Sequence, residues 1–172
     1  IIAPIMRFVN LKGIIALKDG MLAILPLTVV GSLFLIIGQL PFEGLNQAIA
    51  SVFGDTWTEP FMQVYSGTFA IMGLISCFSI GYSYAKNSGV EPLPAGVLSL
   101  SSFFILLKSS YVPAKGEPIG DAIAKVWFGG QGIIGAIIIG LVVGAIYTVF
   151  IQRHIVIKMP EQVPQAIAKQ FE

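Results

Sequence analysis

Long stretches without charge alternate with short polar segments along this chain. Residues 20–40, 61–85 and 126–151 contain no Asp, Glu, Lys or Arg. Each stretch exceeds the ~20 apolar residues that a helix needs to cross a ~30 Å hydrocarbon core. Residues 93–107 form a shorter apolar stretch with three serines, which we interpret as a third, short span or as a broken span covered by protein. The pattern predicts an all-α integral membrane protein with about four transmembrane helices.

The segments around the first two spans predict short helices at the membrane surface. Residues 1–19 mix apolar and basic side chains, which favours an interfacial helix followed by a break near Gly13. Within residues 41–60, apolar side chains recur at helical spacing before Gly54, so we expect a second interfacial helix that ends there. Pro26 is expected to bend the first span, because its ring removes a backbone hydrogen bond.

The C-terminal segment, residues 155–172, is also expected to lie on a membrane surface. Val163, Ile167 and Phe171 recur four residues apart within it. A single apolar face on a short segment is typical of an amphipathic helix that lies in the interface and does not cross the bilayer. We therefore interpret residues 155–172 as a cytoplasmic amphipathic linker.

Small residues at every fourth position mark two of the predicted helices. On a helix this spacing makes a nearly continuous stripe along one face, and such stripes let helices approach closely in lipid. The fourth span has Gly132, Ala136, Gly140 and Gly144, and the second has Gly73, Cys77, Gly81 and Ala85. We expect the glycine positions to contact another helix, either within this chain or across a dimer.

The distribution of charge predicts the orientation in the membrane. The segment 41–60 holds three acidic residues and no Lys or Arg. Most basic residues lie instead toward the opposite ends of the spans: Arg7, Lys12, Lys18, Lys86, Arg153, Lys158 and Lys169. The second outer loop holds the other three, Lys108, Lys115 and Lys125, together with acidic residues. Because short cytoplasmic segments are enriched in Lys and Arg, four spans with this bias place both ends of the chain in the cytoplasm.

Composition excludes several classes of protein. Of the 172 residues, 55% are hydrophobic and 11% are charged, whereas soluble domains carry about 25% charge. The formal net charge is +1, and no basic stripe with aromatic residues is present, so nucleic acid is not an expected partner. A single cysteine, Cys77, allows no disulfide within the chain and no CxxC metal or redox motif. The chain starts without methionine, and we interpret it as a piece of a longer protein.

No catalytic residues, metal site or cofactor site is predicted. The single histidine, His154, follows Arg153 at the end of the fourth span. It is either a proton or phosphate site or an interfacial residue at a helix C-terminus, where cations are favourable. None of the four predicted spans contains a carboxylate, although buried ionisable groups are what mark ion and proton paths. Asp19, just before the first span, is interpreted as a solvated residue at a helix start.

A row of hydroxyl groups in the second span is the one candidate for a substrate contact. It consists of Ser76, Ser79 and Ser83. These serines would either line the rim of a sugar site or donate hydrogen bonds to neighbouring helices. The sequence leaves both interpretations open, and it identifies no complete binding site.

Two stretches resemble one known family. ALKDGMLAILPLTVVGSLFLIIGQLP, residues 16–41, and IQRHIVIKMPEQVPQAIAKQFE, residues 151–172, are similar to the first span and the cytoplasmic linker of the membrane component, enzyme IIC, of bacterial phosphotransferase systems. The lactose, cellobiose and diacetylchitobiose permeases are the members they resemble, and IKMPE-x-VP is the most specific run. The lengths and order of the intervening spans agree, so residues 1–172 resemble the N-terminal, oligomerising half of such a permease.

The resemblance implies a role in sugar import. The family takes up a β-linked disaccharide through the bacterial inner membrane, and its IIB and IIA partners supply the phosphoryl group. The membrane component is a homodimer, and its principal sugar-binding carboxylate and histidine belong to the other half. This chain is therefore expected to be a transporter subunit without catalytic residues of its own, supplying dimer contacts and scaffold. The alternative is a self-contained four-span protein that mediates interactions or forms a channel.

Overall fold

The computed structural model describes residues 10–113, 117 and 119–155, and within them the chain is almost entirely helical. The predicted surface helix before residue 10 and all but the first residue of segment 155–172 lie outside the described residues. The helices are α2 (Lys12–Ala23), α3 (Leu25–Gly38), α4 (Glu43–Phe53), α5 (Glu59–Gly67), α6 (Met72–Asn87), α7 (Pro92–Leu106) and α8 (Ile133–Gln152). A two-stranded antiparallel hairpin pairs β1 (Ser110–Tyr111) with β2 (Ile119–Gly120).

The first span is longer than predicted and is broken in two. Helix α2 starts at Lys12, not at residue 20, and it passes through Gly13, where we expected a break. Helices α2 and α3 meet at Ile24 with a bend of 42°. Pro26 is in the first turn of α3. N–H groups in the first turn of a helix have no hydrogen-bond partner within that helix, so a proline at this position removes no hydrogen bond. The bend expected from Pro26 therefore falls two residues before the ring.

The second span agrees closely with its predicted range, and the fourth starts later. Residues Glu59–Asn87 form one long apolar segment, interrupted at Thr68 by a single 3₁₀ turn (Phe69–Ile71). Before α8, 3₁₀ turns replace α-helix over Lys125–Phe128 and Gly130–Gly132. Glycine is among the poorest helix formers, at about 1 kcal/mol less favourable than alanine, so the glycines of this segment delay the helix.

Two helical segments of the described chain are long and apolar enough to cross a membrane, or three if the bent α2–α3 pair is one span. Helix α7 has 15 residues, which is short of the ~20 that a crossing helix needs. It is the short apolar segment for which a short or broken span was predicted. The structure is thus that of an all-α protein with membrane-spanning helices, and a fourth crossing by α7 stays a prediction.

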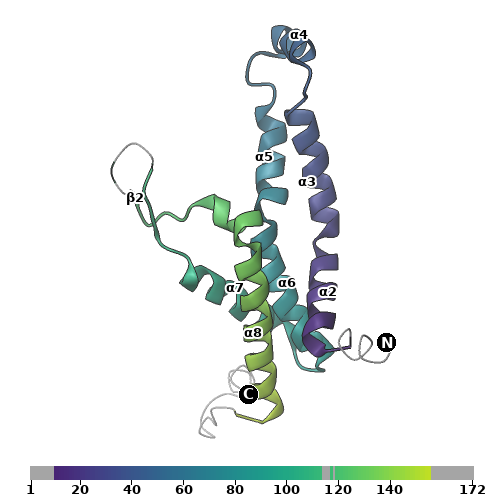
Figure 1. The fold of residues 1–172 in the computed structure, drawn as a ribbon, viewed down its shortest axis with the longest axis vertical. Helices are drawn as coiled ribbons and strands as arrows, with labels where there is room; N and C mark the ends of the chain where they lie inside the picture. The colour runs from purple at the N-terminus through teal and green to yellow at the C-terminus, as the bar shows by residue number, and fades with distance from the viewer. Residues whose placement is uncertain (1–9, 114–116, 118, 156–172) are drawn as a thin grey trace, which may run out of the picture.

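Helix α6 is the centre of the bundle, with α2, α7 and α8 packed around it (Figure 1). The buried cluster between α6, α7 and α8 consists of Cys77, Phe103 and Ala136. Farther along, α3 and α5 pair with each other and carry α4 at their tip. Helix α4 ends before Gly54, whose φ is +88°, a conformation that glycine adopts without steric cost. The predicted helix that ends at Gly54 is confirmed, and its place at the membrane surface stays a prediction.

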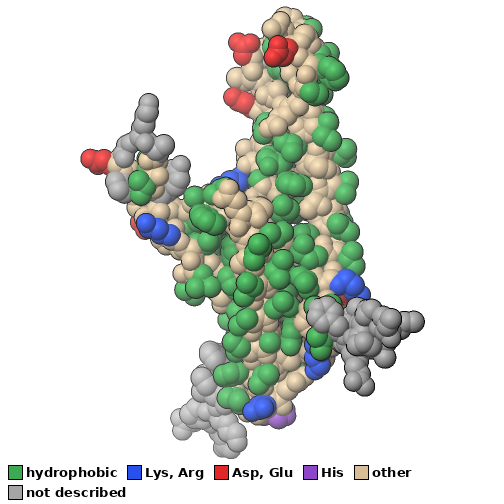
Figure 2. All heavy atoms as spheres, viewed as in Figure 1, with side chains coloured by type: hydrophobic (Ala, Val, Ile, Leu, Met, Phe, Trp, Pro, Cys, Tyr) green, Lys and Arg blue, Asp and Glu red, His purple; other side chains and the backbone are tan. Residues whose placement is uncertain are grey.

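Figure 2 shows a face of the molecule on which hydrophobic side chains cover much of the length between two charged ends. On the face shown, acidic side chains gather at the α4 end and basic ones lie toward the opposite end of the bundle, with further charges beside the hairpin. Many large apolar side chains on α3 and α8 are exposed, Ile36 at 61% and Ile134 at 69% among them. Contiguous apolar surface of this extent suits contact with lipid.

The orientation itself is a testable prediction. Cysteines introduced at Glu43, in α4, and at Gln162, in the predicted linker, are expected to be labelled from opposite sides of the membrane by an impermeant thiol reagent. The native Cys77 is fully buried and serves as an internal control for reagent access. Labelling of both positions from the same side would contradict the predicted topology.

Candidate functional site

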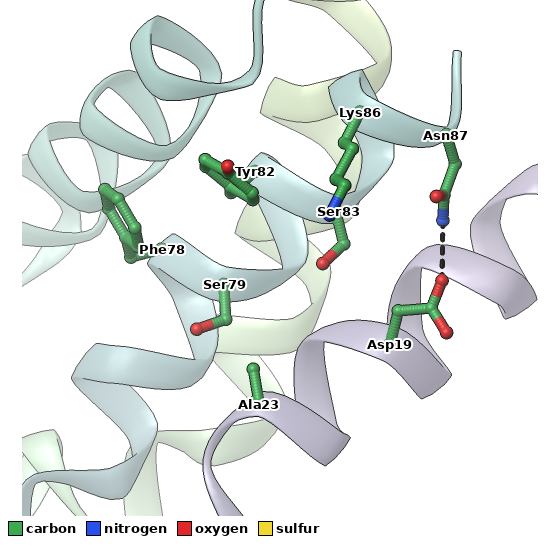
Figure 3. Close-up of a pocket in the computed structure, with 8 residues that line it drawn as sticks. All are labelled: Asp19, Ala23, Phe78, Ser79, Tyr82, Ser83, Lys86 and Asn87. Atoms are coloured by element: carbon green, nitrogen blue, oxygen red, sulfur yellow. Dashed lines mark hydrogen bonds between the residues drawn. The ribbon is translucent and has the colours of Figure 1, made fainter. Parts of the chain in front are cut away.

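A cleft lined by polar and apolar side chains lies between α2 and α6 near the basic end of the bundle (Figure 3). Its volume is about 390 Å³. Two lining residues come from α2 and six from α6: Asp19, Ala23, Phe78, Ser79, Tyr82, Ser83, Lys86 and Asn87. It brings polar and charged side chains together with aromatic ones, and it contains two of the three serines singled out from the sequence.

The helical repeat of α6 explains how these side chains reach one cleft. Ser79, Ser83 and Lys86 recur at intervals of four and three residues, so they share one face of the helix. Phe78 and Tyr82 follow the same spacing beside them, and their rings stack with centroids 6.1 Å apart and planes 24° apart. The cleft therefore has hydroxyl groups along its α6 wall and aromatic faces next to them.

Asp19 supplies the carboxylate of the cleft and ties α2 to the end of α6. The amide nitrogen of Asn87 donates a hydrogen bond of 2.8 Å to one Asp19 oxygen, drawn in Figure 3. The ammonium of Lys18 lies 3.3 Å from the other oxygen. The Lys18 and Asp19 side chains are 63% and 37% exposed, and such surface pairs contribute little to stability. Their effect is to hold the carboxylate in place.

The interpretation of Asp19 as a residue at a helix start is wrong. It was expected to be a solvated residue at a helix start, but it lies well inside α2 and is bonded to a distant helix. The helix around Asp19 begins at Lys12, so the carboxylate lies within the helix that leads into the predicted first span. The hydropathy pattern hid it, because a stretch defined by the absence of charge necessarily stops at the first charged residue.

The structure separates the three serines. Ser79 and Ser83 line the cleft. Ser76 is fully buried and donates a 2.6 Å hydrogen bond to the carbonyl of Met72, one turn earlier in its own helix. The position of Ser79 and Ser83 is compatible with the rim of a sugar site. Ser76 does not line the cleft, and its hydroxyl group forms a hydrogen bond within α6.

Several cleft residues were missed from the sequence. Tyr82 and Lys86 share the helical face of Ser79 and Ser83, so the spacing of α6 already contained the signal for them. The hydrogen bond between Asn87 and Asp19 could not be predicted from the spacing, because 68 residues separate the two. Contacts between helices at that separation depend on packing and not on local pattern.

The small-residue positions lie against neighbouring segments of the same chain. A Cβ atom on Gly140 would be 2.9 Å from the carbonyl oxygen of Cys77, and one on Gly144 would be 2.8 Å from Cβ of Tyr84. One on Gly73 would be 2.7 Å from the carbonyl oxygen of Gly129. Gly81 faces Ser99 of α7, Gly132 faces the backbone of Trp127, and Ala136 is fully buried. These positions therefore face elements of the same chain.

The chemistry that the cleft offers is recognition by hydrogen bonding. Hydroxyl, carboxylate, amide and ammonium groups stand beside two aromatic rings, a combination suited to a small polar ligand in a largely apolar site. Cys77 is outside it, and its thiol hydrogen-bonds the carbonyl of Ser99 at 3.2 Å. In residues 10–113, 117 and 119–155, no group of three or more His, Cys, Asp or Glu side chains is placed to hold a metal ion.

The described residues thus form a bundle of helices in which apolar segments long enough to cross a membrane pack around α6. The family model described as phosphotransferase system, EIIC, matches residues 18–172. The chain belongs to this EIIC family.

Individual relatives agree with that assignment. The chain is 40% identical to the lichenan permease IIC component of Bacillus subtilis (strain 168), over 96% of this chain and 38% of the relative. It is 38% identical to the cellobiose-specific EIIC component of Geobacillus stearothermophilus, over 91% of this chain and 36% of the relative. The chain thus spans less than two fifths of the length of these two relatives.

A solved structure shares the fold. The crystal structure of the transporter ChbC, the IIC component of the N,N'-diacetylchitobiose-specific phosphotransferase system, matches with a TM-score of 0.86 at 33% identity. The match covers 99% of this chain and 41% of ChbC. The helical arrangement described above is therefore that of an EIIC transporter over nearly the whole chain.

Proposed function

We propose that this chain is part of a sugar permease that imports a β-linked disaccharide while a IIB partner phosphorylates it. The observation that carries the proposal is the 40% identity to a lichenan permease IIC component over 96% of the chain. Other relatives are named for cellobiose, for oligo-beta-mannoside and for lactose. Cellobiose and lactose are β-linked disaccharides, so we propose this class of sugar and not one member of it. The alternative, a self-contained four-span protein, agrees less well with the comparisons, because these relatives are more than twice as long as this chain.

The proposed partners follow from the same relatives. One of them is a lactose-specific EIICB component, whose name joins a C and a B component, and this supports a IIB protein as the phosphoryl donor and a IIA protein behind it. We further propose a homodimer in the bacterial inner membrane with both ends of this chain in the cytoplasm. The chain is proposed to be a transport subunit whose residues do not perform the phosphoryl transfer.

Within that permease, we propose that the α2–α6 cleft forms a rim of the sugar path. Ser79 and Ser83 provide hydroxyl groups, and the ring of Tyr82 provides an apolar face of the kind on which sugars pack. Hydroxyl groups and one carboxylate match a polyol better than they match an ion, which would need several charged or carbonyl ligands. The principal sugar contacts are proposed to lie in the part of the permease beyond this chain.

The proposal is tested with the full-length permease in membrane vesicles. Vesicles supplied with phosphorylated IIB are expected to accumulate phosphorylated cellobiose, diacetylchitobiose or lactose. Omission of IIB is the control, because uptake coupled to phosphorylation requires the donor. If the cognate IIB phosphorylates none of these sugars in the presence of the permease, the function proposed here is contradicted.

The role of the cleft has its own prediction. Substitution of Ser79 by phenylalanine is expected to lower sugar phosphorylation in vesicles at least tenfold, because the ring would fill much of a cleft of about 390 Å³. Ser51 of α4 is the matched control, since it is exposed and bonds only the carbonyl of Ala48 in its own helix. Equal rates for S79F and S51F at equal expression would remove the cleft from the sugar path.

A further inference from the structure

The Tyr82 ring in the α2–α6 cleft is oriented by packing on Phe78. The two residues are one helical turn apart on α6, and their rings stack with centroids 6.1 Å apart (Figure 3). Among the residues that the structure describes, none forms a hydrogen bond with the phenol of Tyr82. The direction of the Tyr82 ring in the cleft therefore depends on the ring beside it.

Phe78 is itself held in place by α7. A Cβ atom on Gly96 would be 2.7 Å from Cε2 of Phe78 and 3.0 Å from both Cδ2 and Cζ. Gly96 is buried, so the Phe78 ring lies directly on the α7 backbone, and even a methyl group at residue 96 would displace it. Gly96, Phe78 and Tyr82 thus form a continuous series of contacts from α7 to the cleft.

The hydroxyl group of Ser83 indicates that this wall of the cleft faces a polar ligand. Ser83 is only 8% exposed, and within residues 10–113, 117 and 119–155 its hydroxyl group has no hydrogen-bond partner. By contrast, Ser76 and Ser99 each donate to the carbonyl one turn earlier in their own helix, which is the usual bond of a serine inside a helix. A largely buried hydroxyl group without a partner costs free energy, and a ligand hydroxyl in the cleft would remove that cost.

A pyranose ring matches this wall, because it has hydroxyl groups at its edge and C–H groups on its faces. It can hydrogen-bond the Ser83 hydroxyl group while one of its faces packs on the Tyr82 ring. Aromatic rings bind through such directed contacts between faces and edges as well as through the area they bury. The affinity of the cleft for a sugar then depends on the direction of the Tyr82 ring.

We propose that Phe78 is a positioning residue for sugar binding. Packed between Gly96 and Tyr82, it holds the Tyr82 ring in the direction in which a pyranose ring of the disaccharide stacks on it. The inference rests on the function proposed above, since it assigns how the cleft holds its sugar. A stacked aromatic pair changes an equilibrium constant by about two- to tenfold, which sets the size of the expected effect.

The test measures phosphorylation by phosphorylated cognate IIB with the full-length permease in membrane vesicles. The sugar is whichever of cellobiose, diacetylchitobiose and lactose the unmodified permease accepts. Phe78→Leu is expected to raise the KM for the sugar about fivefold and to leave the KM for IIB unchanged. A variant that only loses folded protein lowers the maximal rate and not the KM. Phe69→Leu is the matched control, because Phe69 stacks on Tyr65 in the same long apolar segment, with centroids 5.7 Å apart, and does not line the cleft.

Double variants show whether Phe78 acts through Tyr82. Tyr82→Leu is expected to raise the KM for the sugar, and Phe78→Leu is expected to add no further rise in that background. Gly96→Ala is expected to raise the KM by displacing the Phe78 ring, and Phe78→Leu is expected to remove this effect because the ring is gone. Gly135→Ala is the control for the added methyl group, since a Cβ atom there would meet nothing within 4 Å.

Four results would overturn the inference while leaving the proposed function in place. They are an unchanged sugar KM in Phe78→Leu, an equal rise in Phe69→Leu, an undiminished effect of Phe78→Leu in the Tyr82→Leu background, and an effect of Gly96→Ala that persists without Phe78. If the unmodified permease supports phosphorylation of none of the three sugars, the proposed function is contradicted, and the inference with it.

Discussion

Leucine in place of Gly140 is expected to destabilise the full-length permease by about 1–3 kcal/mol, the usual cost of overpacking a tight contact. Gly140 lies where α8 meets α6. A Cβ atom there would be 2.9 Å from the carbonyl oxygen of Cys77 and 3.0 Å from Cβ of Ile80. Neither neighbour is the end of a flexible side chain, so the two helices would have to move apart. Unfolding of the purified protein in increasing denaturant measures the change.

Gly135 provides the matched control on the same helix. A Cβ atom on Gly135 would meet nothing within 4 Å, so Gly135→Leu changes glycine to the same side chain without a steric conflict. It is expected to leave stability unchanged or to raise it slightly, because leucine is the better helix former. If Gly140→Leu and Gly135→Leu unfold at the same denaturant concentration, the close approach of α6 and α8 does not limit stability.

This contact also restricts how the proposed homodimer forms. The sequence left open whether Gly140 and Gly144 contact a helix of the same chain or of a second copy. The structure places α6 against both residues, and a glycine stripe that is already covered has no face free for a partner. The proposed dimer therefore has to use other surfaces, and substitutions at Gly140 are expected to change stability before they change oligomeric state.

The parts of the fold that could be predicted are those governed by local pattern. Helix α4 and its end at Gly54 follow from helical spacing and from the tolerance of glycine for positive φ. The long apolar segment Glu59–Asn87 follows from hydropathy alone. The start of α2 could not be found in this way, because Lys12 and Lys18 resemble the edge of a span although both are helical.

Other features depend on interactions that no local pattern contains. The β1–β2 hairpin pairs two residues on each strand within a loop of mixed charge, too few for an alternating pattern. Some residues of the candidate site could likewise be predicted from local pattern, and others could not. Ser79 and Ser83 could be placed on one face from their spacing, whereas Asp19 reaches the cleft only because α2 packs on α6.

Calorimetry of the chain as an isolated fragment is expected to show no heat of binding with cellobiose, diacetylchitobiose or lactose. The cleft supplies two serine hydroxyl groups, the rings of Phe78 and Tyr82 with one phenol hydroxyl, the ammonium of Lys86, and one carboxylate. That carboxylate already accepts from Asn87 and pairs with Lys18. A ligand site normally buries 70–90% of its ligand among several directed polar groups. Charge-assisted hydrogen bonds are about twice as strong as neutral ones, and the only carboxylate here has much of its capacity occupied.

The full-length permease is the positive control and is expected to bind at least one of these sugars at micromolar strength, which corresponds to about −8 kcal/mol. A fragment that has lost its fold would also show no heat of binding. Circular dichroism distinguishes this case, because a folded fragment keeps its helical spectrum. A helical fragment without heat, beside a full-length protein that binds, assigns the principal sugar contacts to the remainder of the permease. Micromolar binding by the fragment would contradict that division. Ser79 and Ser83 would then become the first residues to substitute, because the cleft would have to hold the sugar by itself.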